Sequence, residues 1–175
     1  MRRLVPLVTL AALAVAGAPA AQARLRGAQT CAGAYVHPTA ATVAAAQSAA
    51  LCLVNAERRS RGLRALQSNA RLIAAAGDHS RDMVRRRYFE HGAFVGRILA
   101  HGYAGGRLVW ALGENLAWGS GDLGIPVAVV DAWMQSPGHR ANILNAGFRE
   151  GGVGVASGVP IGGAGRLGGA TYTTT

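Results

Sequence analysis

The segment SPGHRANIL, Ser136 to Leu144, has the residue order of a helix start with a histidine in its first turn. Ser136 is a favourable N-cap residue. Pro137 suits the first helical position because its ring fixes φ and it has no N–H group to leave unpaired. The unpaired N–H groups of a first turn favour an anion and disfavour a cation. His139 is therefore predicted to be neutral and available as a base or a ligand.

Three longer helices are predicted before this segment. The nearest covers about residues 126–135, a second covers about residues 69–87 with Asn69 as its N-cap, and the first covers about residues 39–61. Gly62 follows the first helix, as is typical of a helix end. Apolar residues recur at helical spacing in all three: Val43, Ala46, Ala50, Leu51 and Val54; Leu72, Ile73, Ala76, His79 and Met83; and Val127, Val130, Trp133 and Met134.

Three further stretches have the pattern of strands. Residues 108–116, 152–156 and 169–174 are rich in β-branched residues or alternate between apolar and polar residues. The glycine-rich sequence SGVPIGGAGRLGG joins the last two and predicts a hairpin. Helices around a small antiparallel sheet make a layered α+β domain. The sequence contains no internal repeat.

The first 23 residues predict a secretory signal peptide. Arg2 and Arg3 precede an apolar run from Leu4 to Ala16, and the AxA pattern ending at Ala23 is typical of a cleavage site. The apolar run is shorter than the ~18 residues that a membrane span needs, so we expect cleavage after Ala23 and no transmembrane segment. The mature chain is therefore expected in the extracellular space or the cell envelope.

The remaining chain divides into an arm and one domain. Residues 24–38 lack periodicity and are predicted to form an irregular N-terminal arm, and residues 39–175 are predicted to form the folded domain. Cys31 and Cys52 are predicted to form a disulfide, because export places them in an oxidising environment. The bridge would close a loop of ~20 residues and stabilise the fold by roughly 3 kcal/mol. The alternative, two free thiols, is less favoured because exposure outside the cytoplasm would oxidise them.

The chain is strongly basic, with a formal net charge of +10, and all 18 of its Lys and Arg residues are arginine. Basic groups attract anionic polymers and acidic lipid headgroups. The arginines are scattered, however, and no aromatic residues are interleaved with them to stack on bases, so nucleic acid is not expected as a partner. A compositional bias toward Arg, Ala and Gly explains the pattern equally well.

Six motifs follow one another along the chain. They are LVNAERRSRGL (53–63), HSRDM (79–83), YFEH (88–91), GENLAWG (113–119), AWMQSPGHRANIL (132–144) and GVGVASG (152–158). Their order and spacing resemble those of the bacterial branch of the CAP superfamily, which comprises cysteine-rich secretory proteins, antigen 5 and pathogenesis-related protein 1. Its members are also called SCP-like extracellular proteins. The resemblance covers the chain from about residue 50 onward and implies an α-β-α sandwich with a small antiparallel sheet between helices.

The resemblance also implies a cleft with particular residues. In many eukaryotic members the central cleft carries two histidines and two glutamates, and the histidines can hold a divalent metal such as zinc. By motif, the first histidine resembles His91, the first glutamate Glu114 and the second histidine His139. The second glutamate would fall near Ser136, where this chain has Gln135 and Ser136 instead. One carboxylate of the family's four-residue set is therefore missing.

These residues support two roles each. His91 and His139 are expected to hold zinc or another divalent cation, with Glu114 and water completing a four-coordinate set. The alternative is that both histidines are hydrogen-bonded structural residues. Glu114 is the candidate catalytic residue. The alternative is that its carboxylate fixes a loop by accepting hydrogen bonds from backbone N–H groups.

Other residues of the motifs are assigned structural or binding roles. His79 is predicted to be a core histidine, because its neighbours at helical spacing are apolar. Asn55 and Arg58 are expected to fix loops through hydrogen bonds. The remaining binding or structural residues are Asn115, Ser136, Arg140 and Asn142.

The sequence favours a binding module over an established enzyme. It contains no GxSxG, HExxH or P-loop motif, which leaves serine-hydrolase, zincin and nucleotide-binding functions without support. The resemblance implies binding more readily than catalysis, because the family shares a fold and a cleft without one agreed reaction, and a fold does not fix a function. We therefore expect a secreted, monomeric binding or cell-envelope protein whose ligand is a lipid, a cell-wall polymer or a protein. The alternatives are a hydrolase that activates water with Glu114 and a metal, and a structural envelope protein with a vestigial cleft.

Overall fold

The computed structural model describes residues 29–103, 111–161 and 168–175. The predicted signal peptide and the first residues of the predicted arm lie outside these ranges. The described helices are α2 (Val43–Arg59), α3 (Ala70–Arg86), α4 (Phe94–Ala100), α5 (Pro126–Gln135) and α6 (Pro137–Ile143), with a 3-10 helix η1 (Gly121–Gly124). The strands are β1 (Gln67–Ser68), β2 (Asn115–Ser120), β3 (Glu150–Gly151), β4 (Val153–Ser157) and β5 (Gly169–Thr174).

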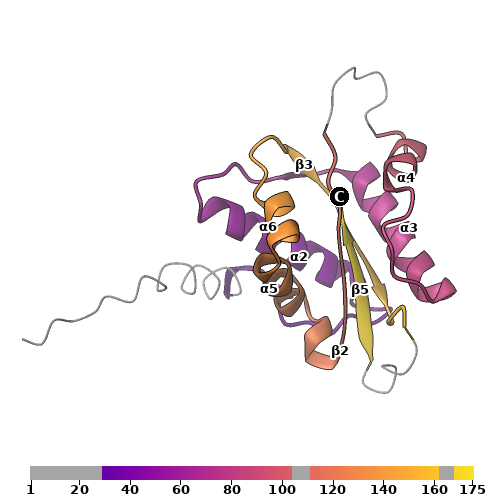
Figure 1. Cartoon of the computed structure of the whole chain (residues 1–175). Helices are drawn as coiled ribbons and strands as arrows, with labels where there is room; N and C mark the ends of the chain where they lie inside the picture. Colours follow the sequence, from indigo (N-terminus) through magenta and orange to yellow (C-terminus); the bar gives the residue numbers. More distant parts are fainter. Residues whose placement is uncertain (1–28, 104–110, 162–167) are drawn as a thin grey trace, which may run out of the picture.

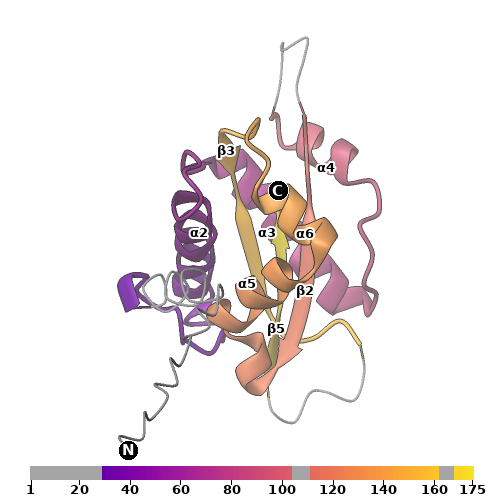
Figure 2. The same ribbon diagram turned by 60° about the vertical axis from the view of Figure 1, so that its left-hand side comes forward.

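The elements form three layers, as predicted. The antiparallel sheet β2-β5-β4 lies between α2, α5 and α6 on one face and α3 on the other, with α4 beside α3 (Figure 1). Figure 2, turned by 60°, shows α5 and α6 in front of the sheet and α3 behind it. The expected α+β class and α-β-α sandwich are therefore confirmed. None of the described helices is long and apolar enough to cross a membrane.

The central strand β5 sets the register of the sheet. Asn115 of β2 and Val153 of β4 both pair with Thr174, so the two outer strands meet β5 at the same level. The predicted hairpin between β4 and β5 is confirmed by their antiparallel pairing, although residues 162–167 of its turn lie outside the described ranges. A separate two-residue parallel pairing joins β1 to β3.

The long helices follow their predictions closely. Asn69 is the N-cap of α3, and its side chain accepts hydrogen bonds from the N–H groups of Arg71 at 3.0 Å and Leu72 at 3.4 Å. Helix α5 has the predicted bounds. Ser136 occupies the predicted N-cap position of α6, but its side chain makes no capping hydrogen bond in the described structure. The start of α6 therefore depends on Pro137 and on the packing around it.

Two predictions of local structure differ from the fold. A strand was predicted at residues 108–116, but the observed strand β2 covers residues 115–120, because its pairing with β5 begins at Asn115. Residues 104–110 lie outside the described ranges. Helix α4, residues 94–100, was not predicted. It has only seven residues and contains Gly96, so it offers too few positions for a helical pattern to be recognised.

The predicted disulfide between Cys31 and Cys52 is confirmed, with an S–S distance of 2.01 Å. It ties the turns at residues 31–35 to α2, and the backbone N–H of Val127 donates to the carbonyl oxygen of Ala34 at 3.0 Å. Cys31 itself is buried in the main core cluster. The described part of the arm is thus held against α2 and α5.

Arg58 joins α2 to two distant loops, as predicted. Its guanidinium is fully buried and donates to the carbonyl oxygens of Arg64 at 2.9 Å, Ile143 at 2.6 Å, Asn145 at 3.0 Å and Phe148 at 3.3 Å. Burial, followed by the nearby charge of Arg149, lowers the pKa of Arg58. The side chain therefore fixes the segment that follows α6.

Asn55 likewise confirms its predicted role, by fixing the backbone at Leu66. Its amide nitrogen donates to the carbonyl oxygen of Leu66 at 3.0 Å, and its amide oxygen accepts from the N–H of Leu66 at 2.7 Å. A side-chain amide that satisfies both backbone groups of one residue fixes an extended loop well. This contact brings the chain after α2 into position for β1.

Candidate functional site

His91 and Glu114 lie together, as the motifs predicted. His91 follows α3 in the loop before α4, and Glu114 directly precedes β2. The imidazole Nδ1 of His91 is 2.9 Å from Oε1 of Glu114. The Glu114 side chain is 1% exposed, whereas the His91 side chain is 53% exposed. Because a carboxylate oxygen accepts, Nδ1–H donates to Glu114, and Nε2 on the other side of the ring is available to a ligand.

Arg97 occupies the other side of the same carboxylate. From α4 its Nη2 donates to Oε2 of Glu114 at 2.5 Å, and its side chain is 16% exposed. Both oxygens of Glu114 are thus engaged, one by an imidazole and one by a guanidinium. The Nε–H of Arg97 is buried and has no hydrogen-bond partner among the described residues. Sequence reasoning gave no role to Arg97, because nothing in the sequence distinguishes it from the other scattered arginines.

His139 is brought to the same region by α6. The side-chain amide of Asn115 donates to the carbonyl oxygen of His139 at 3.1 Å. Asn142, one turn further along α6, donates to the carbonyl oxygen of Glu114 at 3.2 Å and to Oδ1 of Asn115 at 2.9 Å. These bonds fix α6 to the start of β2. Asn115 and Asn142, which were predicted as binding or structural residues, therefore join α6, the helix of His139, to the start of β2, next to Glu114.

The environment of His139 favours its neutral form. Burial, followed by the charge of nearby His91, lowers the pKa of His139. The sequence predicted a neutral His139 from its place in the first turn of a helix, and the lowered pKa agrees with that prediction. The imidazole of His91 is thus supported by Glu114, and the imidazole of His139 is half-buried on α6.

His79 supports the loop that carries His91. It is 3% exposed, which confirms the predicted core position, and its Nε2–H donates to the carbonyl oxygen of Glu90 at 2.9 Å. Burial, followed by the charge of Arg97, lowers the pKa of His79. This histidine thus joins α3 to the residue next to His91 and is neutral near physiological pH.

The expected zinc ligands, His91, His139 and Glu114, do not appear as one metal-binding group among the described residues. In the described part of the chain no three His, Cys, Asp or Glu side chains are grouped so that they could hold a metal. Glu114 is instead the partner of His91 and Arg97. Glu114 lies behind His91, on its Nδ1 side, and metal-binding histidines are commonly oriented by a carboxylate in this way.

The remaining predicted residues lie at the edge of this region. Gln135, in the place of the missing glutamate, is exposed and donates to Asp131 at 2.5 Å. Ser136 is half-buried between α5 and α6, and Arg140 is exposed on α6. No carboxylate replaces the one that the family motif has at this position.

The sequence comparison identifies the family. Residues 51–161 match the cysteine-rich secretory protein family, CAP. The chain belongs to the CAP family. His91, Arg97, Glu114 and His139 all lie within the matched range. The resemblance inferred from the six motifs is therefore confirmed.

Two proteins of Bacillus subtilis (strain 168) are similar to this CAP domain. The protein YkwD of Bacillus subtilis (strain 168) is 39% identical over 118 residues, which cover 65% of this chain and 43% of YkwD. The chain therefore spans less than half the length of that relative. The membrane protein YlbC of the same Bacillus subtilis strain is 33% identical over 106 residues, which cover 60% of this chain and 30% of YlbC.

A solved structure shows the same CAP fold. An extracellular protein containing an SCP domain from Bacillus anthracis (strain Ames) superposes with a TM-score of 0.55 at 21% identity, covering 78% of this chain and 43% of that one. An outer surface protein of Borrelia burgdorferi gives a TM-score of 0.51 at 19% identity, covering 71% of this chain and 86% of that one. These similarities support the sandwich architecture of the CAP domain.

Proposed function

We propose that the protein is an exported binding module of the cell envelope, whose ligand contacts the exposed side of His91 and the neighbouring His139. The observation that carries this proposal is the engagement of both Glu114 oxygens, by His91 at 2.9 Å and Arg97 at 2.5 Å. A general base needs a carboxylate that can reach a water molecule. A carboxylate that is 1% exposed and paired on both sides is better suited to orienting His91.

Export is supported by three independent features. The first 23 residues have the pattern of a secretory signal peptide. The disulfide between Cys31 and Cys52 persists in oxidising compartments and is rare in the cytoplasm. Structures with the same fold include an extracellular protein and an outer surface protein. The formal net charge of the whole chain is +10, to which Arg2 and Arg3 of the predicted signal peptide contribute, and the excess of arginine that remains in the mature chain favours an anionic polymer of the cell wall as the ligand.

Sedimentation with purified, insoluble cell-wall sacculi tests this proposal. The mature protein is expected to bind saturably, and the His91→Ala/His139→Ala variant to bind at least tenfold more weakly. His37→Ala is the matched control, because that histidine is 60% exposed and pairs with Asp122, away from the site. Equal binding by wild type and the double variant would contradict a role for the two imidazoles.

Salt separates binding by the site from attraction by the arginine-rich surface. Exposed charges are strongly screened when ionic strength rises from about 0.1 M to about 1 M. Binding through the site is expected to persist in part at high salt and to remain sensitive to the two histidine substitutions. Binding that disappears at high salt and ignores the substitutions would assign the interaction to the surface instead.

A divalent cation held by the two imidazoles is a second candidate ligand. It is favoured by the Glu114–His91 contact, which leaves Nε2 of His91 available, as in many metal sites. His91 and His139 would hold the ion, which would supply Lewis acidity. Calorimetric titration of zinc into metal-stripped protein should then give one-site binding that is lost in His91→Ala/His139→Ala and kept in His37→Ala. Absence of saturable binding would reject this candidate.

A further inference from the structure

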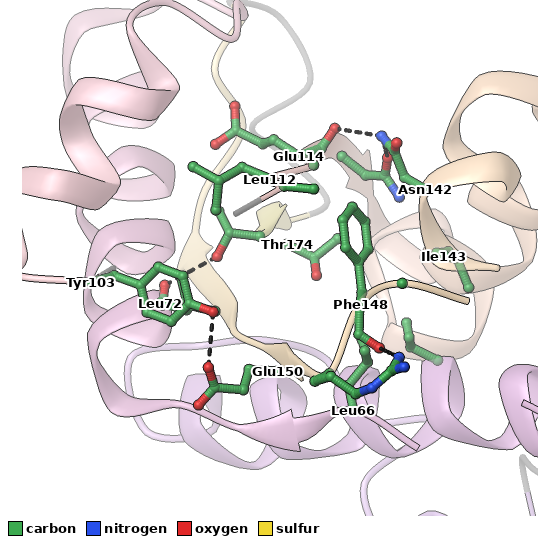
Figure 3. A pocket seen from close by; sticks show the side chains of 17 residues that line it. Leu66, Leu72, Tyr103, Leu112, Glu114, Asn142, Ile143, Phe148, Glu150 and Thr174 are labelled. Atoms are coloured by element: carbon green, nitrogen blue, oxygen red, sulfur yellow. Dashed lines mark hydrogen bonds between the residues drawn. The ribbon is translucent and has the colours of Figure 1, made fainter. Parts of the chain in front are cut away.

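A cavity of about 190 Å³ lies beside the segment that carries Glu114 (Figure 3). Residues from α2, α3 and α6 and from the end of β5 line it, together with the loop that follows α6. It is separate from the imidazoles of His91 and His139, neither of which is among the residues described as lining it. The apolar side chains of its wall are Val54, Leu66, Leu72, Leu112, Ile143 and Phe148.

The walls of this cavity are held in place by the fold. Val54, Leu72 and Ile143 are 1%, 2% and 3% exposed, so they belong to the packed core. Another wall is formed by the end of α6 and the loop after it, and Arg58 donates to the carbonyl oxygens of Ile143, Asn145 and Phe148 there. Side chains and backbone that are already fixed lose little freedom when a ligand binds. The cavity is therefore preformed.

The polar groups at the wall are already paired within the protein. The carboxylate of Glu150 accepts from Asn69 at 2.9 Å and from the hydroxyl of Tyr103 at 2.9 Å. Asn142 donates to Glu114 and Asn115, as described above. Arg149, at the exposed mouth, donates to the backbone of the loop itself. A charged ligand group would lose its water inside the cavity, where the hydrogen-bonding groups named above already have protein partners and most of the wall is apolar, so the cavity favours a neutral group.

The size of the cavity sets the size of that group. An apolar cavity of about 150 Å³ engineered in another protein stays dry and binds benzene. From the volume, the apolar walls and the paired polar groups, we propose that this cavity binds a neutral apolar group about the size of one aromatic ring. The ring belongs to a free aromatic molecule or to an aromatic side chain of a peptide. This site is independent of the function proposed above.

Titration with fluorinated probes, followed by ¹⁹F NMR, tests this site. The mature protein is titrated with 4-fluorotoluene, which represents a free aromatic molecule, and with N-acetyl-4-fluorophenylalaninamide, which represents a peptide side chain. Saturable binding of either probe is expected. Preference for the first assigns the cavity to free aromatic molecules, and preference for the second assigns it to peptides. Failure of both probes to bind would overturn the proposal.

Two tryptophan substitutions locate the binding. Leu112→Trp replaces an aliphatic side chain of the cavity wall with a larger indole ring. This ring fills part of the cavity and is expected to weaken binding at least tenfold. Leu123→Trp is the matched control, because Leu123 is 73% exposed on η1 and is not among the residues that line the cavity. This variant should bind the probes as strongly as wild type does. The amide spectrum of each variant reports its fold. Equal binding by wild type and a folded Leu112→Trp variant would place the probe elsewhere and overturn the proposal.

A third variant keeps the test decisive if Leu112→Trp does not fold. Phe148 is half-buried at the mouth, and its ring lies against Gly113, where an added Cβ would be 3.0 Å from the ring carbons. Phe148→Ala enlarges the cavity and should shift its preference at least fivefold from 4-fluorotoluene toward 1-fluoronaphthalene. An unchanged preference in a folded Phe148→Ala variant would contradict binding at this place.

Discussion

Arg97 and Glu114 form an ion pair in which the carboxylate is almost completely buried. The guanidinium of Arg97 lies 2.5 Å from one carboxylate oxygen, and the side chains are 16% and 1% exposed. Desolvating a carboxylate is costly unless it is paired, so this arginine offsets the cost of burying Glu114 behind His91. The pair also connects α4 to the start of β2, and thereby fixes the loop of His91 from its second side.

Removal of Arg97 should therefore destabilise the domain. In Arg97→Met, Glu114 keeps one partner and loses its countercharge, and we expect a loss of about 3 kcal/mol in the free energy of unfolding, measured by urea denaturation. Arg85→Met is the matched control. That arginine is 77% exposed in its pair with Asp82, so the loss there should be below about 1 kcal/mol.

The Arg97→Met/Glu114→Gln double variant tests the pairing itself. Because it removes both charges, it should be more stable than Arg97→Met alone. Additive losses from the two substitutions would show that the residues act independently and would contradict the buried pair.

Arg58 should be irreplaceable even by lysine. Its Nε, Nη1 and Nη2 atoms reach four carbonyl oxygens in two loops, a geometry that a single ammonium cannot reproduce. Arg58→Lys is expected to lower the free energy of unfolding by about 3 kcal/mol or more, because buried carbonyls lose their partners. The neighbouring Arg59→Lys, at an exposed position, should change it by less than about 0.5 kcal/mol. Similar losses in the two variants would contradict this role.

These two arginines show how far the sequence predicts the site. Arg58 lies in a recognised motif, and its role in fixing loops was predicted. Arg97 lies in a short helix without periodicity, and its contact with Glu114 spans 17 residues of chain. The family resemblance allowed us to predict that His91 and Glu114 lie together. It did not allow us to predict that the guanidinium of Arg97 pairs with the second oxygen of Glu114, because that contact depends on where α4 packs.

His79 should make stability depend on pH. Its pKa is lowered in the folded protein from an ordinary value of 6.5, first by burial and then by Arg97, against the opposing influence of Glu114, the Glu90 carbonyl and Asp82. The unfolded chain therefore binds the proton more readily. The stabilisation from neutral His79 is present above about pH 6.5 and is lost as the pH falls through the folded-state pKa.

Urea denaturation between about pH 7.5 and pH 5 measures this dependence. The free energy of unfolding should fall with pH in wild type and fall less in His79→Gln, whose amide can still donate to Glu90. His139 has a lowered pKa and contributes with the same sign, so His139→Gln is the comparison that separates the two. An NMR titration that places the His79 midpoint at or above 6.5 would contradict the prediction.

Loss of the disulfide should loosen the N-terminal segment. The bridge joins residues separated by 21 positions, and Cys31 is itself in the core cluster. The Cys31→Ser/Cys52→Ser variant is expected to lose about 3 kcal/mol in the free energy of unfolding. Dithiothreitol should destabilise wild type and leave the variant unchanged. A reductant effect of equal size on both would mean that the bridge is not responsible.

The contact between α3 and β4 is the part of the fold that sequence patterns describe least well. The GVGVASG motif predicted a strand, but not that Gly154 packs directly on the helix backbone. A Cβ at Gly154 would overlap backbone atoms of Ala76 and Gly77, and Ser80 also donates to the Gly154 carbonyl oxygen at 3.0 Å. A glycine within a strand indicates that another group can approach closely, but the sequence does not show which group does so. The partner is defined only by how the helix and the sheet pack.

Gly154→Ala should therefore be strongly destabilising. The added methyl group must push α3 away from the sheet, and overpacking of this kind costs about 3 kcal/mol. Gly96→Ala is the matched control, because a Cβ there would have no atom within 4 Å and alanine favours the helix α4 by about 0.5–1 kcal/mol. Urea denaturation should thus show opposite signs for the same chemical change. A loss below about 1 kcal/mol in Gly154→Ala would mean that α3 and β4 are not in backbone contact.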